Sequence, residues 1–421
     1  NNFYYCWGEP LHTDFALRRD AAEYPYIEQP AKATGNDHFD AWPSANDWYE
    51  TVKLNYGVDY CDAGGRSMHF DPIPSTWTKM LDILLFWCAK GVDAFRCDMA
   101  EMVPVEFWEW AIGRVRQAYP SIVFIAEVYN PALYRDYICR GGFDYLYDKV
   151  GLYDTLRAVV RGEAPASAIT GQWQCVDDIR KHMLYFLENH DEQRIASPFF
   201  CGDARKAMPA FVAEAFMSNN PLMVYAGQEI GERADDAEGF SGRDGRTTIF
   251  DYWSPQKLQK LFALGADGKV RKNAQTAFAQ TAYAGNGLVM TAEERELYAT
   301  YRRIISLRES ESALVAGQFY DLMYVNHDYA QKFDSKRHYA FLRRSEDQLL
   351  LVVCNFSDKA SEMGVRIPTH AFEYLRIPEG SFRAAELLSG EKFALAMHPD
   401  GFTQVQVPAH GAVCYSIQCQ D

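Results

Sequence analysis

The sequence lacks an apolar run long enough to cross a lipid bilayer, so no transmembrane helix is expected. It also lacks a Cys-x-x-Cys pair and any Cys/His cluster with zinc-site spacing, although it contains ten cysteines. Cysteines scattered singly through a chain of this size are typical of buried thiols in a reducing compartment, which favours the cytoplasm. Because the chain does not begin with methionine, it carries no information on a signal peptide, and an extracytoplasmic location stays open.

Positive charge is scarce relative to negative charge, with 42 Lys and Arg against 57 Asp and Glu and a formal net charge of -15. A surface of this sign repels phosphate backbones, so nucleic acid is not an expected partner. The sequence contains no internal repeat and no low-complexity segment. Its 421 residues exceed one ordinary domain, and we therefore expect a large domain followed by a smaller one.

Strand-like and helix-like segments alternate from about residue 76 to about residue 312. The apolar runs that predict strands are 92–98, 122–128, 143–148, 183–189 and 221–229. Such alternation predicts an α/β fold with a parallel sheet and right-handed crossovers. Five strand-helix units are visible, whereas a closed TIM (β/α)8 barrel has eight. Either the sheet is open or the first three units lie upstream of residue 1.

The pattern changes after about Ser312 to short strands separated by turn residues, with no comparable helices between them. This pattern predicts an antiparallel β-sandwich domain of about one hundred residues. The expected strands have the sequences HYAFLRRS, QLLLVVCNF, EYLRI, TQVQV and AVCYSI.

Acidic residues follow three of the strand-like runs. Asp98 ends GVDAFRCD, Glu127 follows IVFIA, and Asp191 ends MLYFLENHD. Because an unpaired carboxylate is costly to bury, three of them at the ends of parallel strands predict one shared site at the C-terminal rim of a barrel. Arg96 lies two residues before Asp98 and therefore points to the same side of the strand, where it would keep that carboxylate ionised. His190 is a candidate donor to a substrate hydroxyl.

These residue types suit the cleavage of an acetal. One carboxylic acid protonates the leaving oxygen, while a second carboxylate, about 5–5.5 Å away in retaining enzymes, is glycosylated at the anomeric carbon. A third carboxylate can stabilise the oxocarbenium-like charge of the transition state. Singly, each feature also has a structural explanation. Asp98 with Arg96 could be an ion pair at a strand end, and the turn before Asp191 could be a helix N-cap. Their joint occurrence favours catalysis.

The segments GVDAFRCD, FIAEVYN and FLENHD closely resemble the second, third and fourth signature regions of the α-amylase family, glycoside hydrolase family 13. The order and spacing of the three regions match, which makes the resemblance specific. The roles that it implies are nucleophile for Asp98, general acid/base for Glu127, transition-state stabiliser for Asp191, orientation of the nucleophile for Arg96 and sugar binding for His190.

The resemblance also implies a domain organisation. Residues 1–75 correspond to the remainder of an inserted domain B and a loop-rich segment, residues 76–312 to strands four to eight of the catalytic barrel, and residues 313–421 to the C-terminal β-sandwich domain. The family's first signature region is absent, so the chain resembles a member truncated before strand four. The family's α-amylases often have Lys-His shortly after the nucleophile, at a calcium site, whereas Glu101 and Met102 stand here. Calcium is therefore an open expectation, and no organic cofactor is expected.

The function implied is a retaining glycoside hydrolase that cleaves α-1,4-linked glucans, such as starch, glycogen or maltooligosaccharides, by double displacement. A transglycosylase, an α-1,6-glucosidase or a sugar isomerase of the same family would share the same residues. A catalytically inactive carbohydrate-binding relative is a further alternative, against which the presence of all three carboxylates argues.

Overall fold

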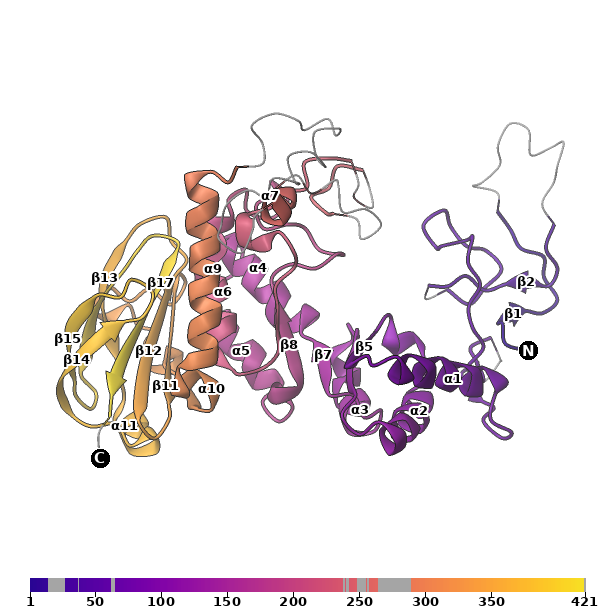
Figure 1. The fold of residues 1–421 in the computed structure, drawn as a ribbon, viewed down its shortest axis with the longest axis horizontal. Coiled ribbons are helices and arrows are strands. Elements are labelled where there is room, and N and C mark those ends of the chain that lie inside the picture. The colour runs from indigo at the N-terminus through magenta and orange to yellow at the C-terminus, as the bar shows by residue number, and fades with distance from the viewer. Residues whose placement is uncertain are drawn as a thin grey trace. The chain divides into compact units, whose positions relative to one another are not determined.

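The computed structural model describes residues 1–13, 27–36, 38–61, 65–237, 239, 242–247, 255, 257–263 and 289–419 (Figure 1). The chain forms two compact units, Asn1–Tyr147 and Asp148–Asp421. Within the described ranges, no helix is both long enough and apolar enough to cross a membrane. The domain boundaries expected after residues 75 and 312 stay predictions.

The first unit begins with loops and short strands and continues as an alternation of helices and strands. Its elements are β1 (Tyr5–Cys6), β2 (Ala31–Lys32), β3 (Val58–Asp59), β4 (Ser67–Met68), α1 (Ser75–Ala89), β5 (Ala94–Cys97), η2 (Ala100–Met102), α2 (Val105–Ala118), β6 (Val123–Ala126), η3 (Pro131–Leu133), α3 (Tyr134–Cys139) and β7 (Tyr145–Tyr147). β5 pairs with β6 and β6 with β7, in both cases in parallel.

Helix α2 shows how the sequence determines this part of the fold. It begins directly after Pro104, whose extended backbone precedes the first turn. The apolar residues at helical spacing, among them Trp108, Ile112 and Val115, are buried. The indole of Trp108 donates a hydrogen bond to the carbonyl of Ala100 at 3.1 Å, which ties the helix to the loop after β5. This loop carries Asp98, one of the predicted site residues.

The second unit continues the alternation of strands and helices. Its elements up to the β domain are η4 (Lys149–Tyr153), α4 (Asp154–Val160), α5 (Ala168–Cys175), η5 (Arg180–His182), β8 (Met183–Phe186), η6 (Ala204–Ala207), α6 (Met208–Met217), β9 (Leu222–Met223), η7 (Gln228–Ile230), α7 (Leu258–Ala263), α9 (Ala292–Ser310) and α10 (Ser312–Val315). β8 pairs with β9 in parallel. The predicted α/β class, with five parallel strands and intervening helices, is thereby confirmed.

The C-terminal part of the second unit is antiparallel, as predicted. Its elements are β10 (Gln318–Asp321), η9 (Met323–Val325), η10 (Ala330–Lys332), β11 (His338–Arg344), β12 (Gln348–Asn355), β13 (Ser361–Arg366), α11 (Thr369–Leu375), β14 (Gly380–Glu386), β15 (Lys392–Met397), β16 (Phe402–Val407) and β17 (Gly411–Gln418). Six strands form one sheet in the order β10-β11-β12-β17-β14-β15, and β13 pairs with β16. All eight residues of β12 are buried. The strand lies between β11 and β17 in the sheet, and α6 and β16 also contact it, so its side chains are covered on both faces.

One predicted strand is wrong. The segment EYLRI, residues 373–377, was expected to be a strand, but its first three residues belong to helix α11. The helix follows Pro368 and buries Ala371, Phe372 and Leu375, which share one helical face. The run by itself is too short to show a helical period, because the apolar residues that complete the period, Ala371 and Phe372, precede it.

Helix α6 contains a buried acid, Glu214, whose burial affects the stability of the fold. Glu214 is 1% exposed, and neither of its carboxyl oxygens has a hydrogen-bond partner among the described residues. The nearby Arg308 instead donates to backbone carbonyls, those of Ala215 at 3.1 Å and of Asn220. Burial raises the pKa of Glu214 well above its ordinary value, and the charge of Arg308 opposes this only in part.

We therefore expect Glu214→Gln to stabilise the protein at neutral pH. The folded state holds the Glu214 proton more tightly than the unfolded state. The contribution of this proton to the free energy of unfolding is therefore fully present below pH 4.5, the ordinary pKa, and is lost as the pH rises toward the raised pKa. A glutamine side chain does not ionise in this range. The free energy of unfolding of Glu214→Gln should therefore exceed that of the wild type by an amount that grows from near zero at pH 4 to about 1–3 kcal/mol at pH 8. Chemical denaturation across this pH range measures it. The exposed Glu309→Gln should show no such trend, and a pH-independent difference for Glu214→Gln would contradict the explanation.

Candidate active site

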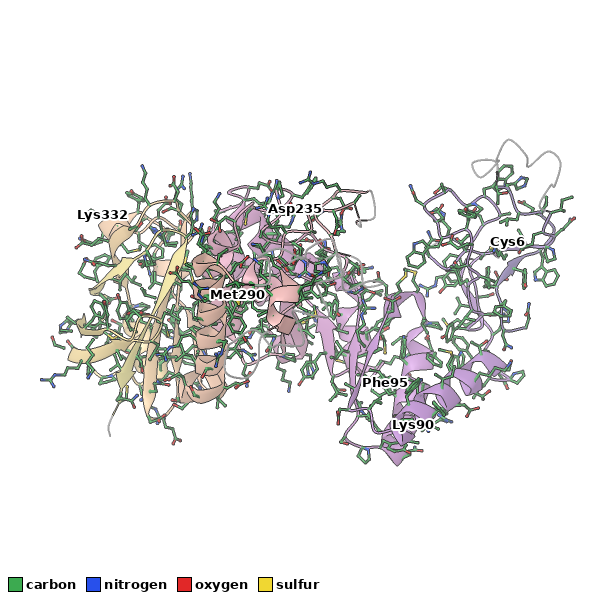
Figure 2. The ribbon with its side chains drawn as sticks, turned by 45° about the horizontal axis from the view of Figure 1, so that its top comes forward. Cys6, Lys90, Phe95, Asp235, Met290 and Lys332 are labelled. Carbon is green, nitrogen blue, oxygen red and sulfur yellow. The ribbon has the colours of Figure 1, made fainter. Side chains whose placement is uncertain are left out.

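Asp98 and Glu127 each follow directly one of two neighbouring parallel strands. β5 and β6 pair so that Cys97 lies opposite Ala126, and the amide of Glu127 donates to the carbonyl of Cys97 at 3.1 Å. Figure 2 labels Phe95 on β5, which locates this strand pair in the first unit. Because the two strands end level with each other, the two carboxylates emerge at the same edge, the carboxyl end of the strands.

Arg96 joins these two carboxylates. Its Nη1 contacts Oδ1 of Asp98, and its Nη2 lies 3.1 Å from Oε1 of Glu127. Its Nε donates to the hydroxyl of Tyr147 at 3.4 Å, and the guanidinium lies over that ring, 5.5 Å from its centroid. Burial acts to lower the pKa of Arg96, but the Tyr147 hydroxyl and the two carboxylates raise it on balance, so the side chain stays charged. The guanidinium of Arg96 thus contacts both carboxylates.

Glu127 is held in one orientation on several sides. The residue is 6% exposed. Its Oε2 accepts a hydrogen bond from the amide of Met99 at 2.8 Å, and its Oε1 accepts one from the hydroxyl of Tyr129 at 2.9 Å. Met99 has a φ of 45°, in the left-handed region that non-glycine residues rarely adopt. This turn after Asp98 aims the Met99 amide at the Glu127 carboxylate, so the strained residue lies beside that acid.

The two acids differ in their exposure to solvent. The Asp98 side chain is 66% exposed, whereas the Glu127 side chain is 8% exposed. Asp98 is therefore open to a reacting group, and Glu127 is enclosed by donors that fix its carboxyl plane. The two acids thus lie at one end of adjoining strands, one exposed and one enclosed.

Asp191 lies in a turn that follows β8 in the second unit. The side-chain oxygen of Asn189 accepts hydrogen bonds from the amides of Asp191 and Glu192, both at 2.9 Å, which forms an Asx turn. Nε2 of His190 lies 3.2 Å from Oδ2 of Asp191. Nε of Arg246 donates to the carbonyl of Asp191 at 2.5 Å, which fixes the apex of the turn.

The five predicted site residues therefore form two groups. Arg96, Asp98 and Glu127 contact one another in the first unit, and His190 contacts Asp191 in the second. The acids of both groups follow the carboxyl ends of parallel strands, and Arg96 lies within β5. The interpretation of the turn before Asp191 as a helix N-cap is wrong, because the chain after it is irregular until η6 begins.

Sequence reasoning missed the tyrosines that complete the first group. Tyr129 stands two residues after Glu127, and alternation along an extended segment would have placed both side chains on one side. Tyr147 ends the next strand, β7, so the sequence also allowed the prediction that it lies at the carboxyl end of the strands. The left-handed turn at Met99 had no signal in the sequence, because methionine has no preference for that conformation.

The described ranges contain no group of three or more His, Cys, Asp or Glu placed to hold a metal ion. The Oε2 of Glu101 accepts from the amides of Tyr129 at 3.3 Å and of Asn130 at 3.0 Å. Its carboxylate thus secures the loop after β6. Calcium binding stays a prediction, and no step below uses it.

Known proteins resemble this chain over parts of their length. No family model matches it. Over 125 residues, 29% of this chain, it is 40% identical to an α-1,4-glucan:maltose-1-phosphate maltosyltransferase of Cereibacter sphaeroides. Over 226 residues, 52% of this chain, it is 28% identical to the α-amylase MalA of Haloarcula japonica. The matched segments span 17% and 31% of those two curated relatives.

Solved structures agree on the fold. The α-amylase of Geobacillus thermoleovorans, determined in complex with acarbose, superposes with a TM-score of 0.58 at 14% identity. The superposition covers 86% of this chain and 67% of that structure. The fold consists of parallel strands with their helices, followed by antiparallel sheets. This fold and the sequence matches to both relatives lead to one conclusion. This chain is a relative of the α-amylase family, glycoside hydrolase family 13.

Proposed function

We propose that this chain acts on α-1,4-linked glucans with retention of configuration, by double displacement. The observation that carries the proposal is the single guanidinium of Arg96, which contacts Asp98 and Glu127 at the ends of adjoining strands. Because one guanidinium contacts both carboxylates, the two acids lie near each other, which supports the retaining mechanism, whose two carboxyl groups are about 5–5.5 Å apart. The relatives' names and the acarbose complex supply the substrate class.

In the first step, the exposed carboxylate of Asp98 attacks the anomeric carbon while Glu127 gives its proton to the departing glycosidic oxygen. In the second step, Glu127 takes a proton from the incoming acceptor, which displaces Asp98 and restores the free enzyme. Asp191 would stabilise the positive charge that develops on the sugar ring, and His190 would bind a sugar hydroxyl. Arg96 orients Asp98 for the attack.

The acceptor decides between two activities. Water gives hydrolysis, the activity named for the Haloarcula relative, and a second sugar gives transfer, the activity named for the Cereibacter relative. The higher identity to the maltosyltransferase favours transfer as a second candidate, over the segment that it covers. Both activities would use the residues described above.

Product analysis of the purified protein tests the proposal. Maltoheptaose alone should give shorter maltooligosaccharides if water is the acceptor. With maltose 1-phosphate added, transfer should lengthen the chains and release inorganic phosphate. Pullulan and sucrose serve as substrates for the α-1,6-glucosidase and isomerase alternatives. Nuclear magnetic resonance during the first turnovers should show the α-anomer, because two displacements retain configuration. A first product in the β-configuration would overturn the mechanism.

A further inference from the structure

The turn that carries His190 and Asp191 is closed by a buried ion pair. Nη1 of Arg194 lies 2.8 Å from Oε2 of Glu188, and both side chains are 1% exposed. The other carboxyl oxygen of Glu188 accepts a hydrogen bond from the amide of Ile195 at 2.6 Å. One carboxylate at the start of the segment thus holds both a side chain and an amide at its end.

Arg194 also ties this turn to two other segments of the same unit. Its Nε donates to the hydroxyl of Thr247 at 3.2 Å, and its backbone amide donates to the carbonyl of Gly245 at 2.7 Å. Its guanidinium lies 4.0 Å from the centroid of the Tyr225 ring, which follows β9. The planar guanidinium suits this combination of a carboxylate, a hydroxyl and an aromatic face.

A buried ion pair contributes little net stability to a fold. Removing two charges from water consumes most of their attraction, and apolar residues of similar volume often stabilise a fold equally well. What the pair adds is direction, since each hydrogen bond fixes an angle as well as a distance. In this protein the pair fixes the orientation of the short turn that carries His190 and Asp191.

We propose that Glu188 and Arg194 are positioning residues, which hold the His190–Asp191 turn in the orientation that catalysis requires. The proposal rests on the proposed function for its effect on turnover. Both side chains are 1% exposed and are therefore not placed to touch a substrate directly. They act through Asp191, which the same segment carries and whose carbonyl Arg246 fixes from outside the pair. Loss of the pair should therefore displace a charge that acts in the transition state and spare the binding of the ground state.

The test replaces the pair as a unit. Single changes leave a buried charge without its partner and can prevent folding, so the decisive variant is Glu188→Leu with Arg194→Met. We expect it to unfold near the wild-type temperature, with kcat lowered about 30- to 100-fold and KM changed less than about threefold. In an Asp191→Asn background the same double change should lower kcat by less than about threefold, because its effect passes through Asp191. The exposed pair Glu379–His398, 3.0 Å apart, replaced by two glutamines, is the control without effect.

Two results would overturn the proposal. One is a folded double variant whose kcat stays within threefold of the wild type, and the other is an equal loss in both backgrounds. Hydrogen exchange gives a readout that does not depend on activity. Amides of residues 189–195 should exchange at least about tenfold faster in the double variant, while those of α6 stay unchanged. If the wild type cleaves no α-glucan, the proposed function fails, and unchanged exchange in this segment would refute the positioning role by itself.

Discussion

Replacing Asp98 with Asn should lower kcat on maltooligosaccharides by about 1,000-fold or more, equivalent to about 4 kcal/mol of transition-state stabilisation. An amide is no nucleophile at the anomeric carbon, so the covalent intermediate does not form. The fold should be unaffected, because the Asp98 side chain is 66% exposed and lies in a loop. Circular dichroism and thermal unfolding check the fold, and initial rates on maltoheptaose measure the loss.

Asp93→Asn is the matched control for this experiment. Asp93 is exposed and precedes β5, whereas Asp98 follows it, so the same chemical change is made at opposite ends of one strand. Its kcat should stay within about twofold of the wild type. Equal rates for Asp98→Asn and the wild type would remove Asp98 from the mechanism. A folded wild type that produces no reducing sugar or transfer product from any substrate would favour the carbohydrate-binding alternative instead.

Replacing Arg96 with Met should lower kcat by about 100-fold. Arg96 contacts both carboxylates and the Tyr147 hydroxyl, so its loss leaves two acids side by side without the cation between them. The acids then repel each other and lose their shared orientation. Arg96→Lys should recover little of the activity, because an ammonium is a point charge that does not reproduce the planar fork. Initial rates across pH 5–8 measure both variants.

Arg116→Met is the control for the Arg96 series. Arg116 pairs with Asp144 at 2.7 Å, and its side chain is 33% exposed against 28% for Arg96. It extends from α2 and touches neither predicted acid. Its loss should change the unfolding temperature modestly and leave kcat within about threefold. An Arg96→Lys variant with wild-type turnover would show that charge alone matters at this position, and that the bidentate geometry does not.

The fold class was readable because it depends on periodicity. The segments of α2 and α9 show the helical period, and the apolar runs that became β6 and β8 end where polar residues begin. The boundaries of the short elements were less accurate. β9 has two residues where a run of nine was expected, and the EYLRI segment is mostly helix. In each case the chain follows its tertiary contacts over a local preference that is weak in short segments.

The order of the elements, the acids that follow the strands and the family resemblance could all be predicted from the sequence, because they depend on residue type and spacing along the chain. Three contacts became visible only in the folded chain. One guanidinium contacts both Asp98 and Glu127, the amide of Met99 donates to Glu127, and Glu188 pairs with Arg194 across the turn. These contacts depend on strand register, on a left-handed backbone and on burial. Each of them is set by packing between segments distant in the sequence or by a conformation that the residue type alone does not favour.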